Sequence, residues 1–134
     1  MATDNIDSAV VAIIKSKSNI TSLLGFYPNS TIPIVNSGVL AKQVTGLPAI
    51  AINDVEFESL NQVMDNDSYI INCFAKTMAE TKKIAKIIIK ELDDTNETID
   101  GFSMRFAASG LPTNGDPTAK EINTPVLLRV TNWR

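Results

Sequence analysis

The stretch Tyr69-Ile-Ile-Asn-Cys-Phe-Ala-Lys-Thr-Met-Ala-Glu-Thr-Lys-Lys-Ile-Ala-Lys-Ile-Ile-Ile-Lys-Glu-Leu92 decides the fold class of this chain. Its first part, residues 69–75, is apolar and rich in residues that favour strands, which predicts a buried strand. Thr77 and Glu80 then have the spacing of a capping box, the signature of a helix N-terminus. The sequence therefore predicts a strand that leads directly into a helix.

The helix predicted over residues 78–92 has two chemically different faces. At about 100° per residue, its apolar side chains share one arc: Met78, Ile84, Ala85, Ile88, Ile89 and Leu92. The lysines of the opposite side are Lys82, Lys83, Lys86 and Lys90. Ile87 falls outside the apolar arc, so we expect it to be exposed. Although a single exposed isoleucine is normal, we name Ile87 as the first candidate for a contact between subunits.

An opening helix and further strands complete the predicted fold. The helix spans about Ile6 to Lys17, with Asp4 placed to cap it, and is followed by a short turn that ends at Gly25. Its apolar stripe consists of Ile6, Val10, Ile13 and Ile14. The other strands are expected at 49–55, 99–109 and 124–133. This order, α-β-β-α-β-β, predicts an α+β fold: a mainly antiparallel sheet of about four strands with two helices packed on one face.

The length of 134 residues fits one domain that spans the whole chain, 1–134. We expect long loops at about 26–46, 54–68 and 110–118. In the first of them, Pro33 restricts the extended piece Ile32 to Val35 to a sheet edge or a loop. The segment 54–68 mixes apolar residues with acids. Either the flanking strands extend into a projecting hairpin arm, or a loop exposes apolar groups there.

The net charge of -3 and the sequence pI of about 4.8 conceal a segregation of charge along the chain. Segments 54–68 and 93–100 hold acids and no bases, whereas segment 76–90 holds lysines and only Glu80 as an acid. Such a distribution can bring like subunits into complementary contact. Solvated loops beside a solvated helix face explain the same observation equally well.

The residue inventory excludes several classes of chemistry. The chain has no histidine and a single cysteine, Cys73, so the usual zinc ligand sets and an internal disulfide are absent. Because Cys73 lies in the apolar strand, we expect a buried packing thiol. The acids lie in segments expected to be solvated, where nothing raises a carboxylate pKa toward neutrality, so we do not expect an enzyme. We expect neither a cofactor nor a metal ion.

Nucleic-acid binding and membrane insertion are also disfavoured. Arg105, Arg129 and Arg134 add to the helix lysines, but the acidic pI and the lack of aromatic residues among the bases argue against a sequence-specific nucleic-acid binder. No apolar run approaches the roughly 20 residues that cross a bilayer, and residues 1–5 lack the basic region of a signal peptide. We therefore expect a protein that is soluble and cytoplasmic when made.

The order of these segments resembles the tail terminator and tail completion (head-tail joining) proteins of long-tailed bacteriophages. The likeness is carried by Ile6-Asp-Ser-Ala-Val-Val-Ala-Ile-Ile-Lys with Leu23-Leu-Gly, by Leu47-Pro-Ala-Ile-Ala-Ile, by the strand and helix of residues 69–92, and by Pro125-Val-Leu-Leu-Arg-Val. It spans nearly the whole chain, but it consists of apolar patterns rather than invariant chemistry. The Pro/Gly-rich segment before Leu47 is less regular than the family pattern.

The resemblance implies a structural virion protein of the tail or neck, assembled in the host cytoplasm. Such a protein forms a ring, typically a hexamer, that ends the tail tube, meets the head connector and neck proteins, and lets DNA pass without sequence-specific binding. The family has no catalytic residues to transfer. We expect the subunit interface at Lys83, Lys86, Ile87 and Lys90. Contacts with the tail tube or connector are expected in segments 26–46 and 54–68, with candidate residues Glu56, Phe57, Glu58, Leu60, Asp65 and Asp67.

A different class of protein has the same predicted architecture. Small ligand-binding and regulatory modules also place two helices on a sheet of this size. Such a module requires an apolar pocket with converging polar groups, and the sequence does not reveal one.

Overall fold

The computed structural model describes residues 6–27, 29–37, 48–59, 64–99, 101–112 and 122–133. Within these ranges the side chains of residues 6, 7, 36, 37, 54–59, 64 and 65 are not described. The elements, in chain order, are α1 (Ile6–Ser16), α2 (Ser18–Thr21), β1 (Val35–Ser37), β2 (Ala49–Ser59), β3 (Met64–Ala75), α3 (Met78–Leu92), β4 (Thr95–Ile99), β5 (Phe102–Gly110) and β6 (Ile122–Trp133).

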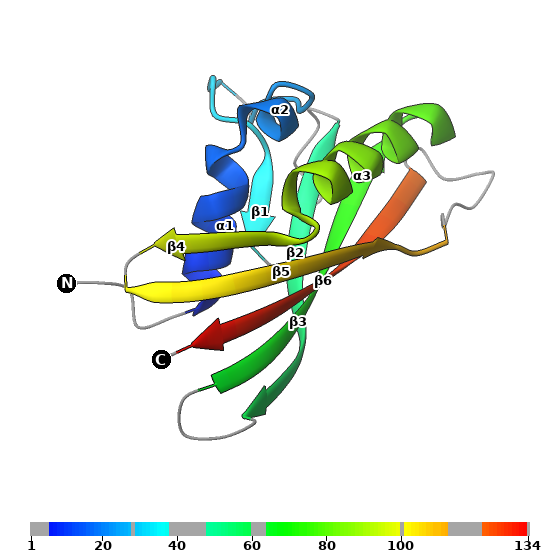
Figure 1. The fold of residues 1–134 in the computed structure, drawn as a ribbon. Helices are drawn as coiled ribbons and strands as arrows, with labels where there is room; N and C mark the ends of the chain where they lie inside the picture. The colour runs from blue at the N-terminus through cyan, green and yellow to red at the C-terminus, as the bar shows by residue number, and fades with distance from the viewer. Residues whose placement is uncertain are drawn as a thin grey trace.

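The strands form one sheet in the order β1-β2-β3-β6-β5-β4. Strands β2 to β6 pair with one another in antiparallel fashion, whereas the short edge strand β1 runs parallel to β2. The sheet curves around α1, and α3 lies along it (Figure 1). Consistent with this curvature, α1 contacts both edge strands, β1 and β4. The α+β class and the antiparallel sheet predicted from the sequence are confirmed.

One face of the sheet supplies the core. Alternate residues of each strand lie on the same face, and on β3 and β6 these are Tyr69, Ile71, Cys73, Val126, Leu128 and Val130, all buried. They pack in a single cluster with α1 and α3 residues such as Ile14 and Ile88, which are both fully buried. Burying a side chain of this size contributes about 1.5–3 kcal/mol. The described residues of both apolar arcs therefore face the core as predicted, except Met78, which is exposed.

The strand-to-helix unit at residues 69–92 forms as the sequence predicts. The Thr77 hydroxyl accepts a hydrogen bond from the Glu80 N–H at 3.2 Å, so Thr77 caps α3. The helix stops at Asp93, and Asp94 adopts a positive φ of 58°, a left-handed conformation that Asp tolerates in turns. After this turn, residues 95–99 form the edge strand β4, although the sequence predicts a strand only from Ile99 onward. Strand β4 forms because its backbone pairs with β5, which low strand propensity does not prevent.

The domain prediction placed a loop at 54–68, but residues 54–59 and 64–68 lie in strands. Strand β2 continues to Ser59 and β3 starts at Met64, so the hairpin alternative is correct. A register shift between Asp54 and Glu56 marks a β-bulge, which increases the local twist. We call the part of this hairpin beyond the bulge, residues 54–59 of β2 with 64–68 of β3, the hairpin end. It lies below the level of the helices in Figure 1.

The first long connection contains more regular structure than expected. Phe26 pairs with Pro33 in an isolated antiparallel bridge, and β1 follows at Val35. Strand β1 lies at the edge of the sheet, as Pro33 nearby requires. The predictions for Asp4, for residues 38–46 and for residues 113–118 concern residues outside those described.

Candidate assembly interface

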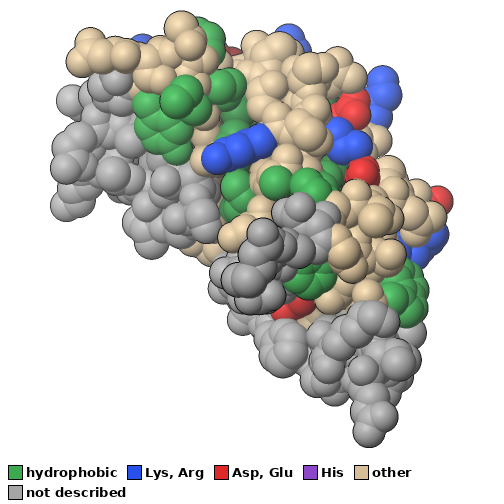
Figure 2. All heavy atoms as spheres, turned by 90° about the vertical axis from the view of Figure 1, so that its left-hand side faces the viewer, with side chains coloured by type: hydrophobic (Ala, Val, Ile, Leu, Met, Phe, Trp, Pro, Cys, Tyr) green, Lys and Arg blue, Asp and Glu red, His purple; other side chains and the backbone are tan. Residues whose placement is uncertain are grey.

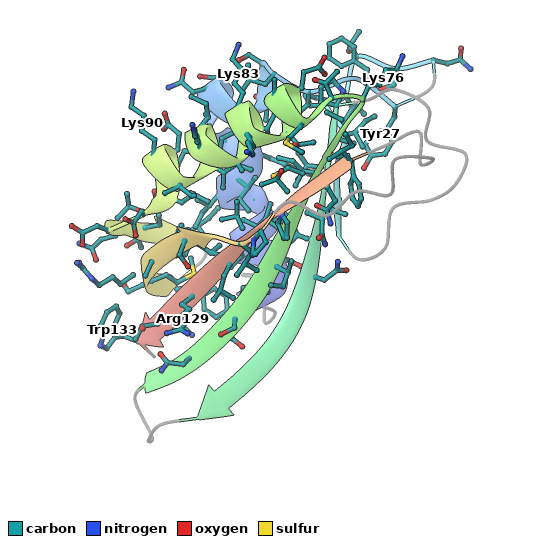
Figure 3. The ribbon with its side chains drawn as sticks, turned by 90° about the vertical axis from the view of Figure 1, so that its right-hand side faces the viewer. Tyr27, Lys76, Lys83, Lys90, Arg129 and Trp133 are labelled. Carbon is teal, nitrogen blue, oxygen red and sulfur yellow. The ribbon has the colours of Figure 1, made fainter. Side chains whose placement is uncertain are left out.

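The lysine side of α3 is exposed over its whole length. Lys82, Lys83, Lys86 and Lys90 all face solvent, and Figure 3 shows Lys83 and Lys90 pointing away from the sheet. Their ammonium groups make no ion pair among those found in the described part of the chain, where Lys17 and Arg105 are the paired cations. This row of free cations is available to a partner.

Ile87 differs from its predicted position. It is half-buried and packs against the core cluster rather than standing exposed among the lysines. The physical reason is α2, which contacts α3 and covers that flank of the helix. A hydrogen bond of 2.7 Å from the Asn19 side chain to the Glu91 carboxylate joins the two helices. Ile87 therefore contributes mainly to the core of its own subunit, and only its remaining exposed surface is open to a neighbour.

A groove lies between α3 and the adjoining ends of β5 and β6, and we call it the α3 groove. Its volume is about 520 Å³. Its lining is mainly apolar, and the residues that form it are Met78, Lys82, Ala85, Lys86, Ile89, Gly110, Leu111, Pro112 and Thr124. Met78 is 51% exposed here, although the helical pattern assigns it to the core arc. The core arc continues beyond the edge of the sheet at this point, so Met78 has no strand to cover it.

The described acids of the block at 93–100, which are Asp93, Asp94 and Glu97, make contacts within the subunit. The Lys17 Nζ lies 2.7 Å from a Glu97 carboxylate oxygen, and Arg105 pairs with Asp94. The Asp93 carboxylate accepts a hydrogen bond from the Ala108 N–H at 3.0 Å. Figure 2 looks onto the side that carries α1 and shows cationic and anionic side chains interspersed there. This block is therefore not the free acidic surface that the charge pattern suggested.

The hairpin end carries most of the predicted tube or connector contacts. Glu56, Phe57 and Glu58 lie in β2 and Asp65 in β3, with backbone register Glu58 opposite Asn66. Their side chains, and Leu60 as a whole, lie outside the described residues. Beyond Ile52, β2 pairs with β3 alone in the described part of the sheet. Acidic residues on an edge strand are a usual means of discouraging unspecific strand pairing.

Asp67 is a correction to the predicted contact set. It is 2% exposed, and it lies on the same face of β3 as the buried residues Tyr69 and Ile71. A carboxylate buried to this extent cannot form the surface contact that a solvated loop would have allowed.

The face of the sheet opposite the helices is hollowed over β3, β6 and β5. The hollow has a volume of about 360 Å³ and is lined by Asn66, Asp67, Ser68, Arg105, Phe106, Ala107, Arg129 and Thr131. Figure 3 shows Arg129 and Trp133 near the end of β6, on the side away from α3. Because Arg105 is already paired with Asp94, Arg129 is the cation that this hollow offers.

The single thiol has the buried character that was predicted. Cys73 is fully buried in β3, and desolvation raises its pKa to about 12. A thiol in this state is neither a nucleophile nor a metal ligand at neutral pH. Within the described residues, no three acidic, cysteine or histidine side chains are grouped so as to hold a metal ion. In the same residues, no helix has the length and hydrophobicity needed to span a bilayer.

Neither a scan against protein-family models nor a search of curated proteins finds a match to this chain. Its function is therefore inferred from its own residues and their geometry.

The sequence missed the α3 groove. Two signals in it pointed there. Lys82 and Lys86, which the prediction assigned to the side opposite the apolar arc, border that arc beside Met78 and Ile89, and Pro112 follows two residues after the end of β5. Each signal taken alone is ordinary. Only the packing of α3 across the ends of β5 and β6 brings them together.

Proposed function

We propose that this protein is a structural virion protein that forms a ring at the end of a phage tail tube. The ring, a hexamer by the family resemblance, stops tube polymerisation and provides the surface that joins the tail to the head connector. The observation that carries the proposal is the separation of two surfaces of opposite charge, the exposed lysines of α3 and the acid-rich hairpin end. A ring requires two different surfaces on each subunit, because its contacts are head-to-tail.

The other surfaces fit the same role. Phe26 and Ile32, which are 52% and 59% exposed, give the connection before β1 an apolar surface for the tube or the connector. The net charge of -3 favours a ring that lets DNA pass without gripping it, because an acidic lumen repels phosphate. The proposed partners are copies of the chain itself, the tube protein and the neck proteins. The protein would reside in the tail or neck of the virion and would have no catalytic role.

Charge reversal on α3 tests the subunit interface. We expect the variant Lys83→Glu/Lys86→Glu/Lys90→Glu to assemble more weakly, because it replaces the cationic face with an anionic one beside an acidic neighbour. Sedimentation velocity over a concentration series measures the oligomer mass, starting from a monomer of 14.5 kDa. An oligomer distribution equal to that of the unaltered protein would remove these lysines from the interface.

Binding to tail tubes tests the function itself. Tubes assembled from the tube protein of the same genome are imaged by negative-stain electron microscopy with and without the purified chain. We expect rings in solution at high concentration and a cap at one end of each tube. Free subunits can be monomeric at low concentration, so tube binding decides the matter. Tubes that stay bare and continue to grow would contradict the proposal.

The α3 groove favours a ligand-binding module as the second candidate function. Its apolar lining and two lysines suit a small amphipathic anion. A protein that stays a monomer, ignores tubes and gains thermal stability with a fatty-acid-like anion would support this candidate over the ring.

A further inference from the structure

The α3 groove has the chemistry of a protein-docking site. Its floor is apolar, with Ala85, Ile89 and Leu111 among the lining residues, and Lys82 and Lys86 add two exposed cations. An apolar patch rimmed by polar residues is typical of an interaction site, and cations beside it favour an occupant that combines apolar with acidic residues. Lys83 and Lys90 do not line the groove, so α3 offers two distinct sets of lysines.

The hairpin end has the complementary composition. In sequence, its β2 half reads Asp54-Val-Glu-Phe-Glu-Ser59 and its β3 half begins Met64-Asp65, so acids alternate with large apolar residues. Its acids also remain the best candidates for a partner, because those of the 93–100 block are engaged within the subunit. The segment that follows Pro112, residues 113–121, is polar and carries a lysine, so it is a poorer complement for this groove.

The two surfaces cannot meet within one subunit. The groove lies where β6 begins, at the end of the sheet where Ala75 pairs with Ile122. The hairpin end lies at the other end, where Met64 pairs with Trp133. At about 3.3 Å per residue, the length of β3 separates them by about 35 Å. Figure 1 shows the start of α3 and the hairpin end at opposite ends of the molecule.

We propose that the α3 groove of one subunit receives the acidic hairpin end of the next copy of the chain. The contact is head-to-tail, so repeating it closes a ring if the rotation closes. In sequence, the hairpin end supplies acids, Glu56 and Glu58, and a large apolar residue, Phe57, which match the two lysines and the apolar lining of the groove. The inference rests on the proposed ring function and deepens it by naming the two surfaces of the seam.

A charge swap tests the pairing. Lys82→Glu/Lys86→Glu alone, and Glu56→Lys/Glu58→Lys alone, should each raise the concentration needed for half-assembly by about tenfold or more. The chain that carries all of these substitutions has opposite charges at every seam again, so assembly should recover. The matched control is Lys15→Glu/Arg129→Glu, which makes the same change of charge at two exposed cations outside α3 and should affect assembly less. Far-UV circular dichroism and urea unfolding check that each variant folds.

Cysteine cross-linking tests the contact directly. Pro112 is exposed at the groove, so Pro112→Cys combined with Phe57→Cys should form disulfide-linked ladders of subunits under mild oxidation. Lys15→Cys with Phe57→Cys is the control, because Lys15 is exposed on α1 and does not line the groove. The native Cys73 is buried and should take no part in either case.

The outcomes separate this inference from the proposed function. Rings that cap tubes but are unaffected by the groove variants would overturn the inference and leave the function standing. Recovery by the charge swap together with bare tubes would support the seam and contradict the tail function. A groove that is covered by the chain's own residues 113–121, or that binds only another protein, would give no recovery and no ladder. Either of these results overturns the proposal.

Discussion

At the scale of single residues, Cys73 illustrates how burial fixes chemical character. The side chain has no exposed surface, and desolvation raises the pKa of its thiol from 9.0 to about 12. Burial in this case stabilises the neutral thiol, because a thiolate in an apolar core loses its hydration. The same residue type at an exposed position near the lysines of α3 would be reactive instead.

The raised pKa predicts how stability depends on pH. Between about pH 9 and pH 12 the unfolded chain has lost the thiol proton while the folded chain keeps it. The free energy of unfolding should therefore fall as the pH rises through this window, by up to about 1.4 kcal/mol per unit. Urea unfolding at several pH values, compared with Cys73→Ala, isolates the effect from the lysines that titrate in both proteins. Parallel curves for the two proteins would contradict it.

At the scale of elements, a short chain of hydrogen bonds fixes α3 to the sheet. The Thr124 hydroxyl on β6 donates to the Thr81 hydroxyl on α3 at 2.8 Å, which donates in turn to the Met78 carbonyl at 2.9 Å. Both threonines are buried, so solvent cannot replace these bonds. The apolar arc of α3 sets which side faces the sheet, and this polar link fixes where along β6 the helix sits.

Removing one hydroxyl of this pair should cost more stability per residue than removing both. Thr81→Val leaves the Thr124 hydroxyl without its acceptor on α3, which should lower the free energy of unfolding by about 1–3 kcal/mol. The double variant Thr81→Val/Thr124→Val should lose less than the sum of the single variants, because no half-pair remains there. Urea unfolding of the four proteins closes the cycle. Strict additivity would show that the two hydroxyls do not interact.

At the scale of the whole molecule, charge is distributed so that one surface stays cationic while other charges cancel locally. The 93–100 acids are engaged by Lys17, Arg105 and the backbone of Ala108. The two charged surfaces that we assign to assembly are the lysine side of α3 and, at the other end of the sheet, the hairpin end. A subunit with net charge -3 can in this way still present a complementary pair of surfaces.

Assembly through such surfaces should depend on salt. Screening shortens the reach of exposed charges from about 10 Å at 0.1 M salt to about 3 Å at 1 M. We expect the concentration for half-assembly to rise by about tenfold between low and high salt. Sedimentation velocity at several concentrations of sodium chloride measures it. Assembly that strengthens with salt would indicate an apolar seam instead.

Sequence reasoning reached the elements whose signals are local. The Thr77 cap, the apolar arc of α3 and the strands at 69–75 and 124–133 carry strong periodic patterns, and all of them form. Sequence reasoning failed where the structure of a segment depends on the strand or helix that it packs against. Residues 95–98 are polar and lie outside the predicted strand, yet they pair with β5 in the sheet. Asp67 and Ile87 reach their burial only through β6 and α2, which no local pattern announces.

The sequence by itself determined the α+β class, the core faces of the helices, the inert thiol and the lysine row, because each follows from residue type and spacing along one element. The tertiary structure alone decided which charges remain free, since ion pairs such as Lys17–Glu97 join residues distant in sequence. It also decided that an apolar groove flanked by lysines lies at one end of the sheet and the acidic hairpin at the other. The spacing of residues along the chain does not determine where these two surfaces lie, because their positions result from strand order and from the packing of α3 on the sheet.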